Sequence, residues 1–434
     1  MGDLGGLKSD SFWSVFGNAA GSGLVLMAGI VVARFLGKEI FGEYGMIRAA
    51  LLTFAVFATF GLGHTATKFI AEAKNKNFVR QIVSASTKIT LLVSVLFALF
   101  LFAFSKQIAV FLNAEHLSLA LRILAVGIVF NAVSSVQIGI LAGFKAFKII
   151  AINNAIVGFV LFVLSVTLTF YFGFEGALSA LLLASLFACV LNIIAVQKNL
   201  KKYPRSKNPL PFSSPCGGNP EGVGGLEQSD NVIRQMLSFS LPVALQEGMQ
   251  YLTTWLQIVL LVKLTNYGEA GLFSAAHQWL MMVLFVPGVL KNVALSHLSG
   301  VNNNAVEHKK VFNRMVQINF FATLIFCLLV FALSGIISAF YGESFVRLPL
   351  VLNIAILSAV FMAVQYVYIQ RYMSLNKTWT HFGLSTIFNV LTLTTAFFFI
   401  RQQPEKGAEI LVSVILVVSV IRLMAYHLVM KIKI

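Results

Sequence analysis

Charged residues are scarce in this chain. Only 11% of its 434 residues are charged, against about a quarter in an ordinary soluble domain, and 58% are hydrophobic. Nearly every long window is apolar over more than about 18 residues, the length that a transmembrane helix needs. The composition excludes a soluble globular protein and predicts an all-α, polytopic membrane protein.

The motifs of the common enzyme classes are also missing. The sequence contains no P-loop, no glycine-rich dinucleotide signature after a strand, no HExxH and no Cys/His cluster with metal-ligand spacing. Of the three cysteines, Cys189 and Cys327 fall inside apolar runs and Cys216 in a loop, so no disulfide framework is expected. We expect no enzymatic activity, no cofactor and no metal site.

Positive charge exceeds negative charge by 16 at pH 7. The basic residues lie between the apolar runs, where they orient helices in a membrane, so we expect a lipid bilayer and no nucleic acid as partner. No basic segment with a short apolar core and a small-residue cleavage site precedes the first run. That run is therefore expected to act as its own insertion signal.

Twelve apolar runs are long enough to cross a membrane. They lie at about 12–36, 41–62, 82–104, 117–141, 152–173, 177–196, 237–263, 270–296, 315–341, 347–372, 378–400 and 408–430. If the N-terminus is cytoplasmic, most Lys and Arg residues fall on cytoplasmic loops or inner span ends. The positive-inside rule then places both termini in the cytoplasm.

One long interruption, at 197–236, divides the chain. It is basic at its start and holds five of the nine prolines, which predicts a cytoplasmic linker without a packed core. We therefore expect an N-terminal lobe at 1–196 and a C-terminal lobe at 237–434, with six spans each. The same basic residues could also touch anionic lipid headgroups.

The two halves resemble each other. An offset of 229 residues places Arg34 on Lys263, Gly42 on Gly271 and Arg48 on His277. Six is an even number of spans, so both halves have the same orientation in the membrane. This predicts two lobes related by a parallel pseudo-two-fold along the membrane normal, with a binding site between them.

Polar residues inside the seventh span form a stripe. At 100° per residue, one face of that helix carries Gln246, Gln250, Thr253 and Gln257. Such a stripe lines a water-filled cavity or bonds neighbouring helices, because lipid would not satisfy it. Glu247, at its edge, is the one acidic residue well inside a span. It is a candidate for proton or sodium coupling, or a structural partner of a nearby cation.

Several cations also lie inside spans. Arg48, His277 and Lys291 are too deep to reach the surface easily and are expected to face a lumen. Arg34 and Lys263 lie nearer the span ends, so they either snorkel to the surface or join that lumen. Pro287 and Gly288, just before Lys291, predict a kink in the eighth span.

Two segments carry a family resemblance. "NAAGSGLVLMAGIVVARFLGKEIFGEYGMIRAALLTFAVFATFGLG" and "GEAGLFSAAHQWLMMVLFVPGVLKNVALSHLSG" resemble spans 1–2 and 8 of bacterial O-antigen (Wzx-like) translocases, of the multidrug/oligosaccharidyl-lipid/polysaccharide exporter superfamily. The resemblance implies two lobes around a cationic cavity that opens alternately to each side of the bacterial inner membrane. It implies an undecaprenyl-pyrophosphate-linked oligosaccharide as substrate and other polysaccharide assembly proteins as partners.

Two acidic positions of such proteins are replaced here. An acidic residue common late in span 7 appears as Gln257, and the Asp that often ends span 2 appears as Thr59 or Phe60. This leaves Glu247 as the candidate for coupling to protons or sodium ions.

The balance of intramembrane charge separates the competing functions. A pyrophosphate is attracted by Arg, Lys and His, whereas a drug cation is attracted by carboxylates. The inventory favours a flippase that binds pyrophosphate through Arg48, His277 and Lys291, with Arg34 and Lys263 as further candidates. A cation-coupled multidrug antiporter of the same superfamily is the alternative. A membrane glycosyltransferase, polymerase or ligase is disfavoured, because the predicted outward loops are short.

Overall fold

The structure is a computed structural model that describes residues 4–73, 76–112, 114–201, 225–300, 305–375 and 377–432. These residues are almost entirely helical and contain no strand. The helices are α1 (Leu4–Thr59), α2 (Leu62–Glu72), α3 (Lys76–Phe111), α4 (Ser118–Gly143), α5 (Phe147–Leu200), α6 (Gly225–Leu264), α7 (Tyr267–Val283), α8 (Phe285–Gly300), α9 (Ala305–Tyr341), α10 (Leu348–Ser374), α11 (Thr378–Gln402) and α12 (Gly407–Ile432). Three 3₁₀ turns, at Glu115–Leu117, Glu343–Phe345 and Pro404–Lys406, connect them.

Two of the helices each contain two membrane crossings. At 1.5 Å per residue, the 54 residues of α5 would extend about 80 Å, far beyond the ~30 Å of a bilayer core. The chain instead turns inside α5 at Gly173 and inside α1 at Gly37, whose φ angles are 57° and 73°. Glycine takes such φ angles without steric cost. With α6 and the pair α7–α8, the chain makes the twelve predicted crossings.

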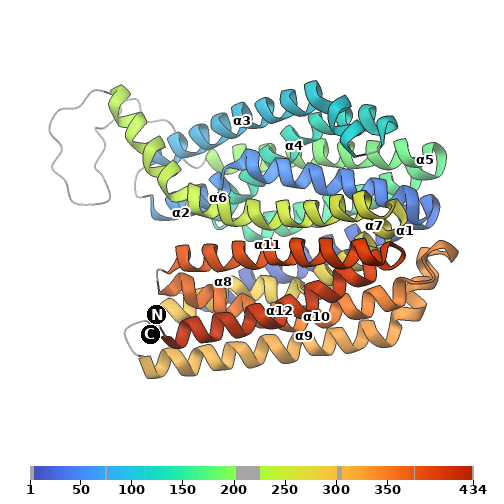
Figure 1. Cartoon of the computed structure of the whole chain (residues 1–434). Helices are drawn as coiled ribbons and strands as arrows, with labels where there is room; N and C mark the ends of the chain where they lie inside the picture. Colours follow the sequence, from blue (N-terminus) through green and yellow to red (C-terminus); the bar gives the residue numbers. More distant parts are fainter. Residues whose placement is uncertain are drawn as a thin grey trace.

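The helices form a bundle with two halves (Figure 1). We call α1–α5 the N-lobe and α6–α12 the C-lobe. Both chain ends are marked at one end of the bundle, which we call the proximal end, and the turns at Gly37 and Gly173 lie at the opposite, distal end. The all-α fold with twelve crossings in two lobes agrees with the sequence-based expectation.

The two described ends of the predicted linker at 197–236 are helical, not extended. Helix α5 continues through Leu200 and α6 begins at Gly225, so the two ends of 197–236 are helical. No proline occurs between residues 221 and 241, so nothing interrupts the backbone hydrogen bonds of α6 there. Most of the predicted linker, including Cys216, lies outside the described residues.

Spans 2 and 8 both break near the proximal side. Span 2 was expected to end at Leu62, but it bends at Phe60 and Gly61, with φ angles of 50° and 67°, and continues as α2. Span 8 breaks at Leu284, between α7 and α8. Pro287 has no N–H to donate to the carbonyl group four residues earlier, which explains this predicted kink.

Repeat-equivalent glycines bring the two lobes together. A Cβ on Gly42 would collide with the carbonyl oxygen of Tyr267, and a Cβ on Gly271 would collide with that of Lys38. Lys38 and Tyr267 are separated by the same 229-residue offset as the two glycines. Contacts that are reciprocal in this way occur about a two-fold axis. The pseudo-two-fold therefore passes between α1 and α7 at this point.

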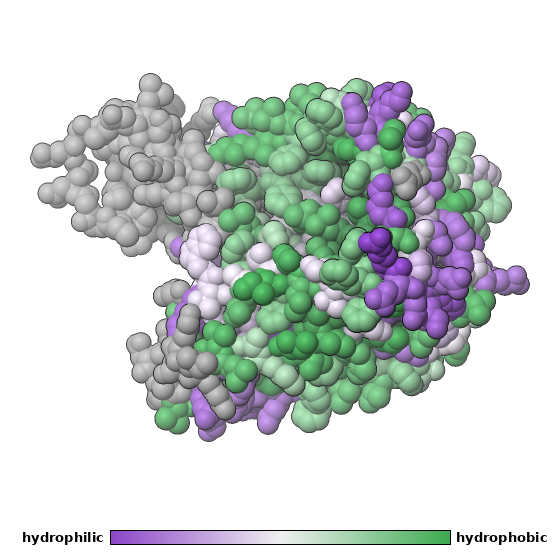
Figure 2. All heavy atoms as spheres, viewed as in Figure 1, coloured by the Kyte–Doolittle hydropathy of each residue, from purple (hydrophilic) through white to green (hydrophobic). Residues whose placement is uncertain are grey.

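The surface has the character expected in a membrane. On the face in view, Figure 2 shows a broad apolar band across the bundle and hydrophilic residues gathered at the distal end. Large apolar side chains are well exposed, among them Leu92, Phe170 and Ile325. On the face in view, the surface is hollowed between the two halves at the proximal end. The chain is a multi-pass membrane protein.

Candidate functional site

The distal end of the space between the lobes is closed by two cations. The Arg34 Nη1 donates to the carbonyl oxygens of Ala339 and Phe340 at the end of α9, at 3.2 and 3.3 Å. The Lys263 Nζ lies 4.5 Å from the centroid of the Phe111 ring at the end of α3. Phe111 and Phe340 are again 229 residues apart. Arg34 and Lys263 are thus equivalent, and each contacts the third span of the other lobe.

This placement separates both cations from the predicted pyrophosphate site. Arg34 and Lys263 were candidates for binding substrate, and in this structure Arg34 contacts the end of α9 and Lys263 contacts the end of α3. Both lie at the distal ends of their spans, where a long side chain reaches the membrane surface. We call the two contacts the distal latch.

Aromatic side chains fill the space beneath the latch. The ring of Phe41 packs against those of Tyr341 and Phe345, with centroids 6.5 and 6.0 Å apart. The Tyr267 hydroxyl donates to the carbonyl oxygen of Leu112 at 3.1 Å. These contacts join α1 to α9 and α7 to α3, so they bridge the lobes. The lobes are therefore closed toward the distal end.

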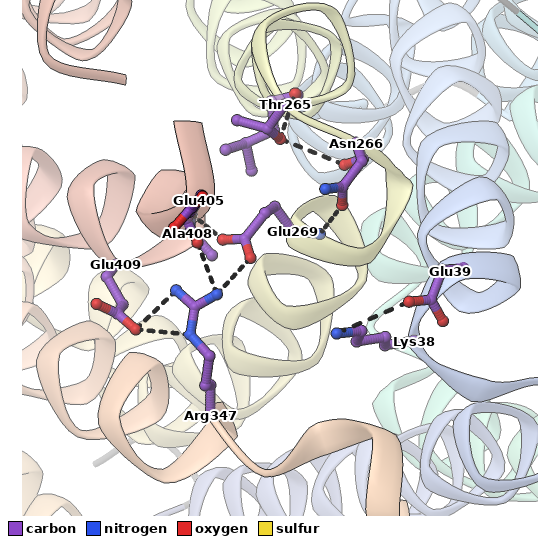
Figure 3. A network of polar contacts seen from close by, with 10 residues as sticks. Lys38, Glu39, Thr265, Asn266, Glu269, Arg347, Glu405, Ala408 and Glu409 are labelled. Carbon is purple, nitrogen blue, oxygen red and sulfur yellow. Dashed lines mark hydrogen bonds and ion pairs between the residues drawn. The ribbon is translucent and has the colours of Figure 1, made fainter. Parts of the chain in front are cut away.

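A polar network fixes the distal end of α7 within the C-lobe (Figure 3). The Arg347 Nη1 donates to Glu269 Oε1 at 2.6 Å, and its Nε and Nη2 donate to Glu409 Oε1 at 2.9 and 2.7 Å. Glu269 Oε2 also accepts the backbone N–H of Ala408 at 2.8 Å. The network joins the starts of α7, α10 and α12. The first turn of α7 therefore moves as part of the C-lobe.

Deeper in the bundle, Arg48 and His277 lie near each other. Both are partly exposed, and the charge of Arg48 acts on the His277 ring. That ring packs against Phe273, with centroids 5.7 Å apart. Neither side chain makes a hydrogen bond or ion pair with another described residue. Their pairing across the two lobes was predicted from the repeat. We call them the deep cation pair.

Lys291 does not lie with the deep cation pair. It follows His277 by fourteen residues and lies on α8, beyond the break of span 8 at Leu284. Its Nζ lies 3.9 Å from the centroid of the Tyr366 ring, and the charge of Glu247 acts on it. These contacts place Lys291 in a second group, and the binding of one pyrophosphate by all three cations stays a prediction.

The second group contains a residue that was not predicted, His64. The His64 Nε2 lies 2.8 Å from Glu247 Oε1, which joins α2 of the N-lobe to α6 of the C-lobe. The two side chains are 60% and 43% exposed, so solvent reaches the pair. His64 lies beyond the predicted end of span 2, on the helix that follows the bend. No pattern in the sequence pairs it with Glu247. We call His64, Glu247 and Lys291 the proximal group.

The predicted polar stripe of α6 does not face the N-lobe. The face of α6 that meets α1 carries Tyr251 and Trp255: Thr53 Oγ1 donates to the Tyr251 carbonyl at 3.1 Å, and the Trp255 and Phe54 rings lie 5.9 Å apart. At 100° per residue this face is turned by more than about 90° from the stripe. Within the stripe, Thr253 and Gln257 are buried, Gln246 is half-buried and Gln250 is exposed.

The site therefore has two layers with different chemistry. The deep cation pair has no carboxylate partner among the described residues, so it favours an anion. The proximal group combines a carboxylate with an imidazole, which together can hold and exchange a proton. Among the described residues, no three Cys, His, Asp or Glu side chains are grouped to hold a metal ion.

Comparison with known proteins places these features in context. Residues 7–289 match the family described as polysaccharide biosynthesis protein. A putative O-antigen transporter of Shigella flexneri is 21% identical over 409 residues, covering 92% of this chain and 93% of that one. An EPS I polysaccharide export inner membrane protein of Ralstonia nicotianae is 26% identical over 184 residues, 39% of each chain.

The fold is also similar to that of a solved transporter. An inward-facing multidrug resistance MATE family transporter of the MOP superfamily superposes with a TM-score of 0.77 and 14% identity, covering 94% of both chains. At this level of identity the similarity shows the fold alone. That fold has the two-lobed arrangement described above.

Proposed function

Since this chain belongs to the family of polysaccharide biosynthesis proteins, we propose that it is a flippase for lipid-linked oligosaccharides. Its substrate would be an undecaprenyl-pyrophosphate-linked repeat unit, moved across the bacterial inner membrane for surface polysaccharide synthesis. The O-antigen and exopolysaccharide relatives support this substrate class. Other polysaccharide assembly proteins would receive the product.

The observation that carries the proposal is the deep cation pair. A diphosphate bridged to a lipid bears negative charge, and an arginine binds phosphate oxygens with two parallel N–H donors. Arg48 has no partner among the described residues, so its donors are available to a ligand. His277, from the other lobe, lies close enough for the charge of Arg48 to act on its ring. A ligand held between them would touch both lobes at once.

The contacts support an order of events. With the distal end closed and the proximal end hollowed, the headgroup enters from the proximal side and passes the proximal group. It then reaches Arg48 and His277, while the polyprenyl chain stays in the bilayer. Rocking of the lobes separates Arg34 and Lys263 from α9 and α3 and opens the distal side. Affinity must stay moderate, because a tightly bound headgroup would not leave.

The orientation follows from the same proposal. The proximal end faces the cytoplasm, with both termini there, and the distal end faces outward. In a chain without native cysteines, a cysteine at Val110 or Glu343, both exposed at the distal end, should react with an impermeant thiol reagent added to intact cells. Labelling of a cysteine in 202–224 under the same conditions would reverse the orientation.

A drug exporter is less well supported. The similarity to multidrug transporters concerns the fold alone. A cationic drug would need carboxylates in the cavity, but Glu247 is bonded to His64 and the deep layer is cationic. Extrusion of a cationic dye by cells that express the chain, at a rate matching a known exporter, would favour this alternative.

The decisive experiment measures translocation of a labelled polyprenyl-pyrophosphate sugar in proteoliposomes. A charge-assisted bond to phosphate contributes about 1.5–3 kcal/mol, so Arg48→Ala should weaken binding roughly ten- to a hundred-fold. Arg48→Lys should keep part of the activity. Arg314→Ala, an exposed cation on α9, is the control and should flip at the parental rate. Parental rates for both Arg48→Ala and His277→Ala would overturn the proposal.

A further inference from the structure

Arg422 is a further intramembrane cation, and it lies within the C-lobe. Arg422 of α12 is ten residues from the end of its helix, and Asn389 of α11 is eleven from the start of its own. Each therefore lies about 15 Å from the proximal end of its helix, near the middle of the bilayer. The Arg422 Nη2 donates to Asn389 Oδ1 at 2.7 Å.

Two buried donors of this pair lack an acceptor. The Arg422 Nε and the Asn389 Nδ2 are buried and make no hydrogen bond with the described residues. The assignment of the Asn389 amide is secure, because an arginine can only donate and the atom that faces it must be the oxygen. Asn389 itself is 4% exposed. A buried donor without an acceptor costs about 1–3 kcal/mol, more when it is charged.

The charge of Arg422 is also unbalanced. The ion pairs of the described residues involve Glu39, Glu43, Glu247, Glu269 and Glu409, and none of them involves Arg422. Its other described neighbours are the Phe388 ring, 5.7 Å from its Cζ, and the side chains of His381 and Tyr426, none of which is a carboxylate. Arg422 is nevertheless not fully enclosed, because part of its surface remains exposed. A water molecule would supply an acceptor but no negative charge.

The N-lobe offers an internal comparison. The 229-residue offset brings Asn192 to within one position of Arg422. There, Asn153 Nδ2 donates to Asn192 Oδ1 at 2.8 Å, and Asn192 Nδ2 donates to Ser134 Oγ at 2.9 Å. This cluster is neutral, and neither of its amides has an orphan atom. The corresponding place in the C-lobe differs by one positive charge and two unused donors.

We propose that Arg422 and Asn389 bind a small monovalent anion, of the class of chloride, between α11 and α12 of the C-lobe. The anion accepts hydrogen bonds from the Arg422 Nε and the Asn389 Nδ2 and neutralises the guanidinium. A halide suits the site because it accepts from several directions and carries a single charge to match a single arginine. The ion stabilises the packing of α11 against α12, and it is separate from the substrate in the cavity.

Thermal unfolding of the purified, full-length protein in detergent tests this site without any transport assay. The Tm is measured in sodium chloride, sodium bromide and sodium gluconate at equal ionic strength. A ligand that binds only the folded state raises the Tm as its concentration exceeds its Kd. The parental chain should therefore be several degrees more stable in saturating chloride or bromide than in gluconate. An equal Tm in all three salts would overturn the proposal.

Two variants locate the effect. Asn389→Asp places a carboxylate beside Arg422 and supplies the missing charge. This variant should be as stable in gluconate as the parent is in chloride, and chloride should no longer raise its Tm. Arg422→Gln removes the charge and should also abolish the salt response. Arg314→Gln, on the exposed face of α9, should respond like the parent. If Asn389→Asp keeps the parental response to chloride, the anion binds elsewhere and the site is wrong.

Discussion

The backbone of Gly42 packs directly against the backbone of Gly271, with no side chain between them. The two residues are equivalent in the repeat and come from different lobes. A two-fold axis places equivalent atoms opposite each other. The distal halves of spans 2 and 8 therefore cross where Gly42 meets Gly271. Closure of the distal end depends on this approach.

The first prediction concerns this contact. In Gly42→Ala, the added Cβ would meet the carbonyl oxygen of Tyr267, and overpacking of this kind costs about 1–3 kcal/mol. Because the strain exists only when the distal end is closed, the ratio of distal-open to distal-closed molecules should rise roughly five- to a hundred-fold. Ser274 is buried in this structure, in which the distal end is closed. The measurement is the rate at which an impermeant thiol reagent, applied to the distal side, labels a cysteine introduced by Ser274→Cys.

Gly23→Ala is the matched control. Gly23 lies in the other crossing of α1, and a Cβ on this residue would meet no neighbouring group within 4 Å. Labelling should stay at the parental level in Gly23→Ala. If Gly42→Ala labels no faster than this control, the glycine contact does not hold the distal end closed.

The second prediction distinguishes a latch from a substrate site. Arg34→Gln removes the bonds to the Ala339 and Phe340 carbonyls, and Lys263→Gln removes the contact with Phe111. Both variants should increase distal labelling of Ser274→Cys several-fold while leaving the affinity for a polyprenyl-pyrophosphate sugar within about two-fold. A large loss of affinity without a change in labelling would instead return both residues to the pyrophosphate site.

A third prediction concerns the Arg347 network. Removal of this guanidinium leaves Glu269, whose side chain is 6% exposed, with the backbone N–H of Ala408 as its remaining donor. Arg347→Ala should cost about 2 kcal/mol of folding free energy, less than a fully buried pair because Arg347 is 37% exposed. The Tm should fall by a few degrees.

Lys38→Ala is the control for this measurement. Lys38 is drawn in the same region of Figure 3 and lies 3.7 Å from Glu39, but the Glu39 side chain is 64% exposed, against 6% for Glu269. Exposed pairs contribute little, so its Tm should be parental. If Arg347→Ala and Lys38→Ala lowered the Tm equally, the contacts of Arg347 with Glu269 and Glu409 would not contribute to stability.

The fourth prediction assigns roles within the proximal group. If Glu247 carries a coupling ion, Glu247→Gln should remove the dependence of flipping on the proton or sodium gradient, and Glu247→Asp should keep part of it. His64→Gln keeps a hydrogen-bond partner for Glu247 but cannot be protonated. Loss of the proton dependence alone in His64→Gln would identify the proton as the coupling ion.

For both variants we would measure the initial rate of flipping in proteoliposomes, with and without an imposed proton or sodium gradient. Gradient dependence that persists in Glu247→Gln and in His64→Gln would make this pair a structural contact between α2 and α6. The coupling, if there is any, would then reside elsewhere.

The lengths of the apolar runs and the internal repeat were sufficient to predict the fold. The apolar runs predicted twelve crossings because lipid forces each one to be a helix. The equivalence of Gly42 with Gly271 predicted a parallel axis between the lobes, and the reciprocal contacts at Lys38 and Tyr267 agree with it. Pro287 predicted the break in span 8 for a local reason, the missing N–H.

The site was harder to predict because contacts between lobes have no local signal. The sequence did not show that Lys291 lies against Tyr366 and near Glu247. Helical periodicity found the stripe at Gln246, but it could not tell which side of α6 faces the N-lobe. His64 was missed because the bend at Phe60 requires a positive φ at a residue other than glycine, which sequence patterns do not indicate.

Single-residue turns at Gly37 and Gly173, together with short 3₁₀ connections, leave little extended chain on the distal face of the bundle. A protease acting on that face would meet little extended chain, and antibodies or phages would find few protruding epitopes. An affinity tag placed there would need its own spacer. A protein that receives the emerging glycan would find no long loop to bind on this face. It would have to bind the sides of the helices within the bilayer.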